Sequence, residues 1–446
     1  MSRDMTGSTV DWSFFSMAKY LLTARPEDPR VMDGDEWAVL LERLAEAAEL
    51  ARGAVPAEAV DRAGMYRGLL QLLSFGLERS LGAADPARPV FSRPWPVHLF
   101  DYGAGNPDAV YRTVVLRDDL TYRISGTLGN AGFIGLEFFD GTRQTGSLLA
   151  ADLRPGPDGE FEVLFGPRER PGNWLRVVPG TSYLLTREFF GDWAAAEPAR
   201  LHIECLDETG RKWPVMSADR VGKELEALGT WLVESVRVFT GAQRNGMAAY
   251  TNAFEARPSR ADSDLPVIFH GFWDLAPGDG LLVEMPEPAG PYWGIQLSNT
   301  LWNTLDFANR QTSLNRAQAR VDGDGMIRFV VAHADPGVPN WLDTLGHRQG
   351  AIHLRLGPAP KEDAAPPPPR RDLAVTRNDW MRSWADGTEE AVQTDAHPAP
   401  RARVVKLDGV AAELPAGAPR VSPGERRAVL DERLRQVVRM QGDART

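Results

Sequence analysis

The sequence predicts an α+β protein that is mainly β: two antiparallel β-sandwich or jelly-roll-like domains joined by helices, with a helical N-terminal segment and a C-terminal tail. Short runs rich in β-branched and aromatic residues occur in two blocks, and turn residues divide the runs within each block. Amphipathic stretches of helical period come before and between the blocks. The content of 43% hydrophobic and 25% charged residues is ordinary for a globular protein, and 42 Gly with 34 Pro favour many turns.

Residues 1–90 are expected to form the helical N-terminal segment. Leu40 and Leu44 follow the spacing of one helix, and Met65 and Leu69 follow that of a second. Neither stretch places a polar residue where it would have to be buried. We therefore expect both helices to serve packing.

Residues 91–216 are expected to form the first β domain. Asp-Gly turns separate its runs, and no helix fits between them, which argues against alternating strands and helices. The expected strands are 110–115, 122–127, 133–139, 161–165 and 183–189.

Residues 217–262 are expected to form a helical connector, because Leu228, Leu232 and Val236 hold the 3.6-residue period. Residues 263–357 return to the β pattern and form the expected second β domain. Within it, the Asp-Gly-Asp-Gly stretch at 322–325 indicates a hairpin turn.

The two β blocks resemble each other. In each block an Asp-Gly turn is followed by a strand, an Asn-Trp-Leu loop and another strand. The Asn follows the Asp of the turn by 15 residues in the first block, Asp158 to Asn173, and by 16 in the second, Asp324 to Asn340. This correspondence predicts a duplicated β unit, with chance similarity between hairpins as the alternative.

Residues 358–446 are expected to form a proline-rich linker and a helical tail. A polyproline stretch at 366–369 is followed by Trp380 and Trp384, one helical turn apart, which we expect to pack on the body or on another subunit. The stretch from Ser422 to Glu425 is a capping box that begins a last helix. Its expected apolar face could support a homo-oligomer and comprises Leu430, Leu434, Val437 and Val438.

Charge and cysteine content exclude several classes of protein. The net charge of −11 opposes nucleic acid or anionic membrane as the main partner, since both require a basic surface. Cys205 is the only cysteine, which suits a reducing cytoplasm. No secretory signal and no apolar run long enough to cross a bilayer are present in the sequence. We therefore expect a cytoplasmic protein.

No phosphate-binding or dinucleotide-binding glycine loop and no nucleophile elbow occur in the sequence. His333 and Asp335 share a strand face, with Asp343 and His347 a loop away, so that a His/His/carboxylate metal site is conceivable. Polar residues that organise a loop through hydrogen bonds are the favoured interpretation. We accordingly expect no metal and no cofactor.

The polar segment 292–318 is the best candidate for a ligand pocket. Alternation along a strand puts Tyr292 and Gln296 on one face and Trp293 on the other. Amides beside indoles are typical of a wall that hydrogen-bonds a ligand inside an apolar cavity. The expected ligand-binding residues are Trp293, Gln296, Asn299, Trp302, Asn309, Asp335, Asn340 and Asp343.

Tyr292, Asp306, Arg310 and His347 are the expected catalytic residues. A carboxylate held by an arginine keeps a depressed pKa, which suits Asp306 to orient a group or to stabilise a cation. The alternative is that Asp306 and Arg310 only hold a long loop in place.

The second β block is similar to the bacterial domain-of-unknown-function family twelve-fourteen. The resemblance rests on the Tyr-Trp strand at 292–297, Asn309-Arg310, the turn at 322–325, Asp335-Pro336-Gly337 and Asn340-Trp341-Leu342. Upstream, 106–111 resembles the Asn-x-Asp-x-x-Tyr motif of its usual companion, family twelve-fifty-four. The two resemblances cover about 95–356.

This resemblance implies two β-rich domains joined by helices, often encoded in bacteria beside enzymes of lipid, steroid and secondary metabolism. It implies no established reaction. The chain departs from the family in its longer helical N-terminus and in the tail after residue 357, so inferences about partners do not carry over.

Three functions are compatible with the sequence. The first is an enzyme without an organic cofactor that acts on a small hydrophobic metabolite, such as a terpenoid, steroid or polyketide, by proton transfer, elimination or isomerisation. The second is a non-catalytic binding or carrier protein for the same kind of molecule. The third is an assembly scaffold, in which the tail recruits a partner.

Overall fold

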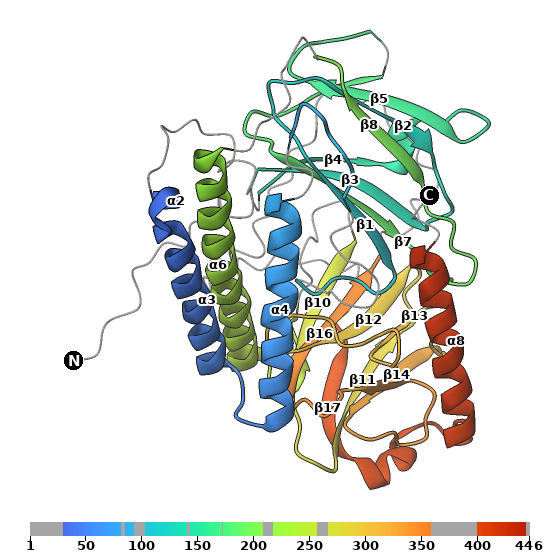
Figure 1. Cartoon of the computed structure of the whole chain (residues 1–446). Helices are drawn as coiled ribbons and strands as arrows, with labels where there is room; N and C mark the ends of the chain where they lie inside the picture. The colour runs from blue at the N-terminus through green and yellow to red at the C-terminus, as the bar shows by residue number, and fades with distance from the viewer. Residues whose placement is uncertain are drawn as a thin grey trace.

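The computed structural model of the chain describes residues 30–81, 85–92, 103–140, 143–171, 173–207, 217–256, 266–357 and 399–442. Two β-sandwiches lie one above the other, with long helices along one side and the C-terminal helix along the other (Figure 1). The fold class is therefore α+β with a β-rich body, as the sequence predicts.

The first sandwich consists of two four-stranded sheets, ordered β1-β7-β3-β4 and β6-β5-β2-β8. Apolar side chains from both sheets meet between them, including Ile124, Phe138 and Phe165. The strands are β1 Ala109–Val115, β2 Tyr122–Thr127, β3 Phe133–Asp140, β4 Arg143–Leu149, β5 Glu160–Gly166, β6 Trp174–Arg176, β7 Tyr183–Phe189 and β8 Arg200–Cys205, with the short helix α5 Ala150–Leu153 after β4.

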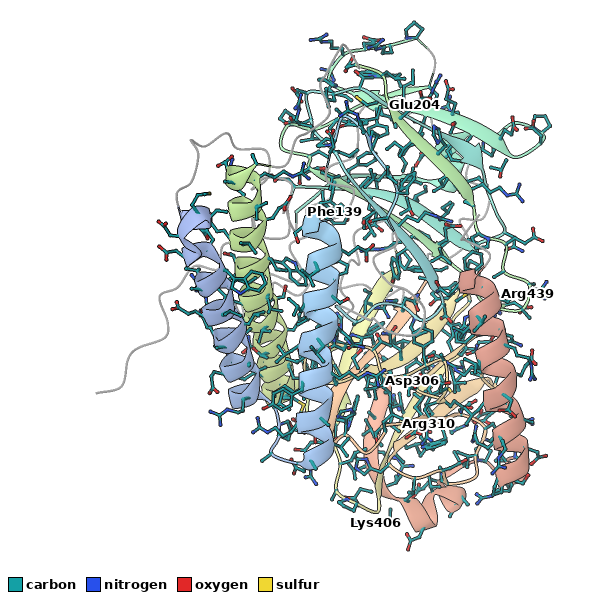
Figure 2. The ribbon with its side chains drawn as sticks, in the orientation of Figure 1. Phe139, Glu204, Asp306, Arg310, Lys406 and Arg439 are labelled. Carbon is teal, nitrogen blue, oxygen red and sulfur yellow. The ribbon has the colours of Figure 1, made fainter. Side chains whose placement is uncertain are left out.

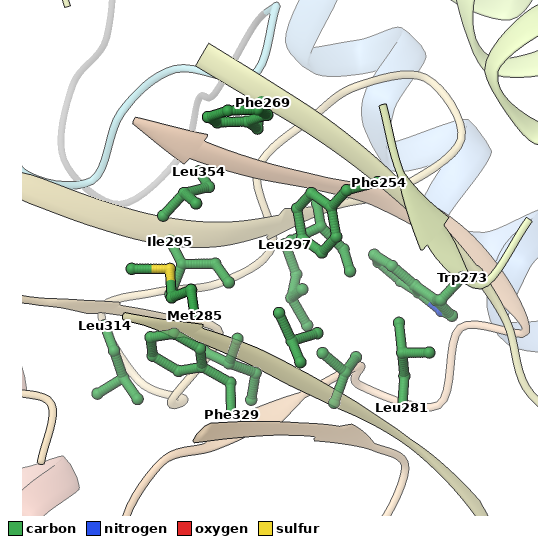
Figure 3. Packing of buried hydrophobic residues seen from close by; sticks show 14 of the residues in the cluster. Phe254, Phe269, Trp273, Leu281, Met285, Ile295, Leu297, Leu314, Phe329 and Leu354 are labelled. Carbon is green, nitrogen blue, oxygen red and sulfur yellow. The ribbon is translucent and has the colours of Figure 1, made fainter. Parts of the chain in front are cut away.

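The second sandwich has sheets ordered β10-β16-β12-β13 and β15-β14-β11-β17. Its core is one cluster of large apolar side chains, among them Phe269, Trp273, Ile295 and Phe329 (Figure 3). The strands are β10 Val267–Asp274, β11 Asp279–Pro286, β12 Trp293–Ser298, β13 Ser313–Asn315, β14 Met326–Ala332, β15 Trp341–Asp343, β16 Gln349–Leu356 and β17 Arg401–Lys406, and a two-residue strand, β9 Ala253–Phe254, precedes them.

The two sandwiches share one topology, which confirms the predicted duplication. When their strands are numbered along the chain, the sheet orders coincide strand for strand. Each sandwich is antiparallel except for one parallel pair, β5 with β6 and β14 with β15. Those pairs contain Trp174 and Trp341, the indoles of the two Asn-Trp-Leu loops.

The last strand of the second sandwich comes from the segment that we expected to be only a linker and tail. β17 pairs antiparallel with β11 from Asp279↔Lys406 to Glu284↔Arg401. The second domain therefore extends beyond residue 357 to include 401–406. The β17 stretch, Arg-Ala-Arg-Val-Val-Lys, is an edge strand with several exposed basic residues, so it lacks the apolar character that marks interior strands.

The helices pack on the outer side of the second sandwich and on one another. The long helix α6 (Ala218–Tyr250) contacts α3 (Asp35–Ala54), α4 (Ala59–Leu81) and β10, and a four-residue helix α2 (Arg30–Asp33) precedes α3. The predicted face of α6 is buried, including Leu228, Leu232 and Val236, and Ser217 accepts a hydrogen bond from the backbone N–H of Arg220 as its N-cap. No helix in the described part of the chain combines the length and apolar character needed to cross a membrane.

The C-terminal helix α8 (Pro423–Gly442) follows the short 3₁₀ helix η2 (Leu407–Glu413) and packs on its own chain. The capping box forms, because the backbone N–H of Ser422 donates to Glu425 and that of Glu425 donates to Ser422 Oγ. An oligomer formed through the tail stays a prediction, and the polyproline stretch, Trp380 and Trp384 lie outside the described residues.

The face of α8 that docks differs from the apolar face we expected. Val437 is buried, but Leu434 and Val438 are 39% and 47% exposed. In their place two arginines are buried: Arg426 donates to Gln311 and Val338 O, and Arg433 lies 4.5 Å over the Trp193 ring. The surface on which α8 packs presents carbonyl oxygens and indole rings. A guanidinium hydrogen-bonds the carbonyls and stacks on the rings, which an aliphatic side chain cannot do.

Adjacent valines of α8 give a test of this docking. Val437→Ala should lower the free energy of unfolding by about 1–3 kcal/mol, because it removes fully buried methyl groups. Val438→Ala makes the same chemical change at an exposed position and should stay within about 0.5 kcal/mol of the native protein. Urea denaturation of both variants measures the difference, and equal effects would contradict the described docking.

Candidate functional site

A layer of buried polar side chains lies on the outer face of the sheet β10-β16-β12-β13, where the second sandwich meets the loop that precedes β1. Strand alternation turns Gln296 to this face and Trp293 into the core of the sandwich, as the sequence predicts. We call these polar side chains, together with Trp302 and the backbone carbonyls of the loop that they contact, the interdomain layer. Its members are Ala104, Gly105, Asn106, Asp108, His270, Tyr292, Gln296, Trp302, Thr304, His353 and Arg355.

Asp108 is the centre of the layer. Its Oδ1 accepts hydrogen bonds from Trp193 Nε1 at 2.8 Å and from Asn315 Nδ2 at 2.7 Å. Its Oδ2 accepts from the Tyr292 hydroxyl at 2.8 Å, and that hydroxyl accepts from Asn106 Nδ2 at 2.7 Å. The three donors to Asp108 come from both sandwiches, so that this carboxyl joins them.

Burial shifts the pKa values of this pair. Desolvation raises the pKa of Asp108, although hydrogen bonds from Asn315, Tyr292 and Trp193 oppose the shift. Desolvation, followed by the charge of Asp108, raises the pKa of Tyr292 well above its usual value. The tyrosine therefore stays protonated and donates, and the carboxyl takes up a proton more readily than an exposed aspartate does.

Gly294 makes room for this pair. A Cβ at residue 294 would lie 2.4 Å from Asp108 Oδ2 and 2.8 Å from the Tyr292 hydroxyl oxygen. The hydrogen bonds of Asp108 and Tyr292 prevent either group from moving aside. The Tyr-Trp-Gly sequence thus supplies one partner of Asp108 and the space that Asp108 occupies.

Two residues with left-handed backbone conformations meet in the layer. Ala104 has φ 55° and Trp302 has φ 57°, and the Ala104 N–H donates to the Trp302 carbonyl at 2.6 Å. Residues other than glycine seldom adopt this backbone conformation, which costs on the order of 1–3 kcal/mol. Residues strained in this way are concentrated at functional sites. Asn299 holds the turn, because its carbonyl accepts from the Trp302 N–H at 2.9 Å.

Beneath Trp302 lies a pair of histidines. His270 Nδ1 and His353 Nδ1 are 3.0 Å apart, and the Trp302 ring lies 5.2 Å and 5.0 Å from the two ring centroids. Burial, followed by the neighbouring His270 and Arg355, lowers the pKa of His353 well below its usual value. In a neutral pair one Nδ1–H donates to the other Nδ1, so the ring that donates keeps a lone pair on its Nε2.

Several buried polar atoms of this face have no hydrogen-bond partner within the described residues. They include His353 Nε2, Ser298 Oγ and Gln243 Nε2. Gln243 lies on α6 and accepts from Trp302 Nε1 through its Oε1 at 3.1 Å. Buried polar atoms are normally satisfied, so such a group of atoms is typical of a place that water or a ligand occupies.

Three of the residues predicted from the sequence belong to the interdomain layer: Tyr292, Gln296 and Trp302. Gln296 Nε2 donates to the carbonyls of Ala104 and Gly105 and to Thr304 Oγ1. Trp293 lies in the core of the second sandwich beside Phe329, away from the face that carries Gln296.

The expected pairing of Asp306 with Arg310 does not form. Asp306 accepts from the backbone and side chain of Asn309, and Arg310 pairs with Asp343 at 2.6 Å. Both predicted catalytic residues lie in the second sandwich, on the loop between β12 and β13 (Figure 2). The fold brings Asp343 up from β15, 33 residues later, and sequence proximity did not indicate that partner.

The remaining predicted residues hold elements of the fold together. His347 Nδ1 lies 2.9 Å from Asp61 Oδ1 of α4, Asp335 pairs with Arg426 of α8 at 2.9 Å, and Asn340 hydrogen-bonds the backbone of Arg320. Within the ranges that the structure describes, no three His, Cys, Asp or Glu side chains lie close enough to hold a metal ion.

Sequence reasoning missed Asp108, His270, His353 and Arg355 as site residues. A signal existed for Asp108, because it belongs to the Asn-x-Asp-x-x-Tyr motif, whose three polar residues meet here: Asn106 N–H donates to the Tyr111 hydroxyl at 2.9 Å. For the histidines no signal existed, since they lie on different strands, 83 residues apart.

Neither the family models nor the curated proteins contain a match to this chain. Among solved structures, the chain is similar to an uncharacterised protein from Burkholderia cenocepacia, with a TM-score of 0.68, 27% identity, and coverage of 86% of this chain and 99% of that chain. The VPA0106 protein from Vibrio parahaemolyticus aligns with a TM-score of 0.40, 12% identity, and coverage of 81% and 100%. The first likeness supports the fold, and the resemblance to families twelve-fourteen and twelve-fifty-four stays a prediction.

Gly294→Ala tests the close packing around Asp108. The new methyl group must displace hydrogen-bonded oxygen atoms, and we expect it to lower the free energy of unfolding by about 1–3 kcal/mol. Gly323→Ala is the control, because a Cβ at residue 323 meets nothing within 4 Å. Urea denaturation measures both, and a Gly294 variant as stable as the control would show that the layer can rearrange.

The depressed pKa of His353 predicts a pH dependence of stability. The unfolded chain binds a proton at this residue below about pH 6.5 and the folded chain does not, so acidification favours unfolding by about 1.4 kcal/mol per pH unit. His353→Gln should remove that contribution between pH 6.5 and 5. His202→Gln, at an exposed histidine of β8, should leave the slope unchanged. Denaturation at several pH values measures the slopes, and equal slopes for the two variants would refute the assignment.

Proposed function

We propose that the protein is a cofactor-independent enzyme that moves a proton on a small, mostly apolar metabolite in the interdomain layer, as an isomerase or lyase of lipid or secondary metabolism does. One observation carries the proposal: burial raises the pKa of Asp108 and lowers the pKa of His353 within the same layer. A carboxyl with a raised pKa holds a proton more readily, and a histidine with a lowered pKa stays unprotonated at neutral pH, so the two groups can serve as an acid and a base.

The geometry supports distinct roles for the two groups. His353 Nε2 has no partner among the described residues and suits the base that removes a proton from a substrate carbon. Asp108 suits the acid that returns a proton, and Tyr292, whose hydroxyl donates to Asp108 and accepts from Asn106, holds its carboxyl in position. Trp302 and Phe239, with ring centroids 6.1 Å apart, supply an apolar surface.

The proposed substrate is a terpenoid, steroid or polyketide-like molecule, because the layer borders an apolar cluster that includes Trp231, Phe239 and Phe272. Such a surface excludes water and strengthens electrostatic interactions with the reacting group. We place this activity in the cytoplasm, on the ground that Cys205 is the single cysteine of the sequence.

A binding or carrier protein for the same class of molecule is the second candidate. It is favoured by the saturation of Asp108, whose two oxygens already accept three hydrogen bonds. A carboxyl held in this way positions its neighbours, and this structural role accounts for its burial without any catalysis.

Proton transfer has a direct readout in deuterium exchange. Wild-type protein in D₂O should label a small apolar ketone or enone, chosen from a screened library, at the carbon next to the carbonyl. Tyr292→Phe removes only the hydroxyl that joins Asn106 to Asp108, and we expect it to slow labelling by about 10²–10⁴-fold.

Tyr66→Phe, which removes a hydroxyl from a 54% exposed side chain of α4, should label at the wild-type rate. Mass spectrometry measures the exchange in each protein. Library members that bind tightly but are never labelled would reject the enzyme and support the carrier.

A further inference from the structure

The internal duplication allows the interdomain layer to be compared with its counterpart in the first sandwich. In the sheet β1-β7-β3-β4, Arg187 lies opposite Gly135, and Glu137 follows two residues later on the same face. In the sheet β10-β16-β12-β13, Arg355 lies opposite Gly294, and Gln296 follows two residues later. Gly-Leu-Glu in the first unit thus corresponds to Gly-Ile-Gln in the second.

The two arginines differ in what neutralises them. Arg187 Nη1 donates to both oxygens of Glu137 at 2.8 Å, which is an ion pair with a fully buried carboxylate. Arg355 donates instead to Gln296 Oε1 and to the carbonyl of Ala104. Replacement of the carboxylate by an amide keeps a hydrogen bond and removes the counter-charge.

Arg355 is only 7% exposed, and its guanidinium contacts in the described part of the chain are Gln296 Oε1 and the Ala104 carbonyl, with no carboxylate within 4.0 Å. Burial without a counter-ion is costly for a guanidinium, and here it lowers the pKa of Arg355. Asp108 attracts Arg355 from a greater distance, but it also faces the buried Arg433 of α8, which likewise has no carboxylate at ion-pair distance among the described residues. Counted over the described residues, the layer therefore has an excess of positive charge at this point.

We propose that Arg355, oriented by Gln296, binds the carboxylate of a small organic acid. A planar guanidinium with free N–H groups matches a carboxylate in shape and charge. His353, which precedes Arg355 by two residues on the same strand face, then lies beside the apolar part of the same ligand, under Trp302. The inference rests on the proposed function in that it names the substrate class of the same layer: a mostly apolar molecule that carries a carboxylate.

Matched ligands test the inference in the wild-type protein. Hexanoate and hexanamide have the same chain and differ in charge, and isothermal titration calorimetry measures the affinity of each. We expect hexanoate to bind at least tenfold more tightly than hexanamide. Equal affinities, or no binding of either ligand, would overturn the carboxylate subsite.

Matched variants show whether Arg355 is the group responsible. Arg355→Met should abolish the preference for hexanoate without lowering the midpoint of thermal unfolding, because it removes an unneutralised buried charge. Arg112→Met should lower that midpoint, because it leaves the carboxylate of Glu188 buried without its arginine partner, and should keep the preference, because this pair lies on the inner face of the first sandwich. If Arg355→Met fails to fold, Arg355→Lys replaces it and should weaken hexanoate binding more than tenfold, since an ammonium lacks the planar fork. A preference that survives in the Arg355 variant would overturn the assignment.

Failure of this inference is distinguishable from failure of the proposed function. A protein that labels neutral ketones with deuterium and binds both ligands equally would lose the carboxylate subsite and keep the proton transfer. A protein that prefers hexanoate and labels nothing would keep the subsite and lose the enzyme.

Discussion

The buried carboxyl of Asp108 is the interaction on which the arrangement of this molecule depends. It accepts hydrogen bonds from Trp193 of the first sandwich and from Tyr292 and Asn315 of the second. The positive charge of Arg433 on α8 also attracts it. Burial of a carboxyl without such donors would lower the stability of the fold by several kcal/mol. The cost is offset only while all the donors are in place, so the elements that supply them depend on one another. Because the donors belong to different elements, this single group fixes how the two sandwiches and the last helix meet.

The duplicated architecture shows that one fold can carry different polar residues on corresponding faces. Both units have the same strand order, and both place a glycine and an arginine opposite each other on the outer face of one sheet. In the first unit the outer face carries a paired charge, since Arg187 forms an ion pair with Glu137. In the second unit the corresponding face carries an amide and two histidines. The ion pair neutralises the buried charge of the first face, and among the described residues the second face has no such pair.

The sequence predicted the secondary structure better than it predicted which side chains interact. Strand alternation placed Gln296 and Trp293 on opposite faces correctly, since the pleat of one strand is a local property. The pairing of Asp306 with Arg310 was wrong, because Arg310 reaches Asp343 across a loop and Asp306 is held by Asn309. On α8, hydrophobic periodicity indicated Leu434 and Val438, yet these are exposed and two arginines share the buried face with Val437. The partners of Arg310 and of the α8 arginines lie 33 residues or more away along the chain.

By itself the sequence determined the fold class, the duplication and the residues that form strand and helix interiors, because period, turn chemistry and the Asn-Trp-Leu repeat are local features. Only the tertiary structure decided which polar residues come together. His270 meets His353, and Asn106 and Asp108 meet Tyr292, through strand pairing and domain contact that span 83 to 186 residues. Burial then shifted the pKa values of Asp108 and His353 and placed Arg355 where no carboxylate of the described residues lies at ion-pair distance. Burial is a property of the packed chain, which no stretch of sequence contains.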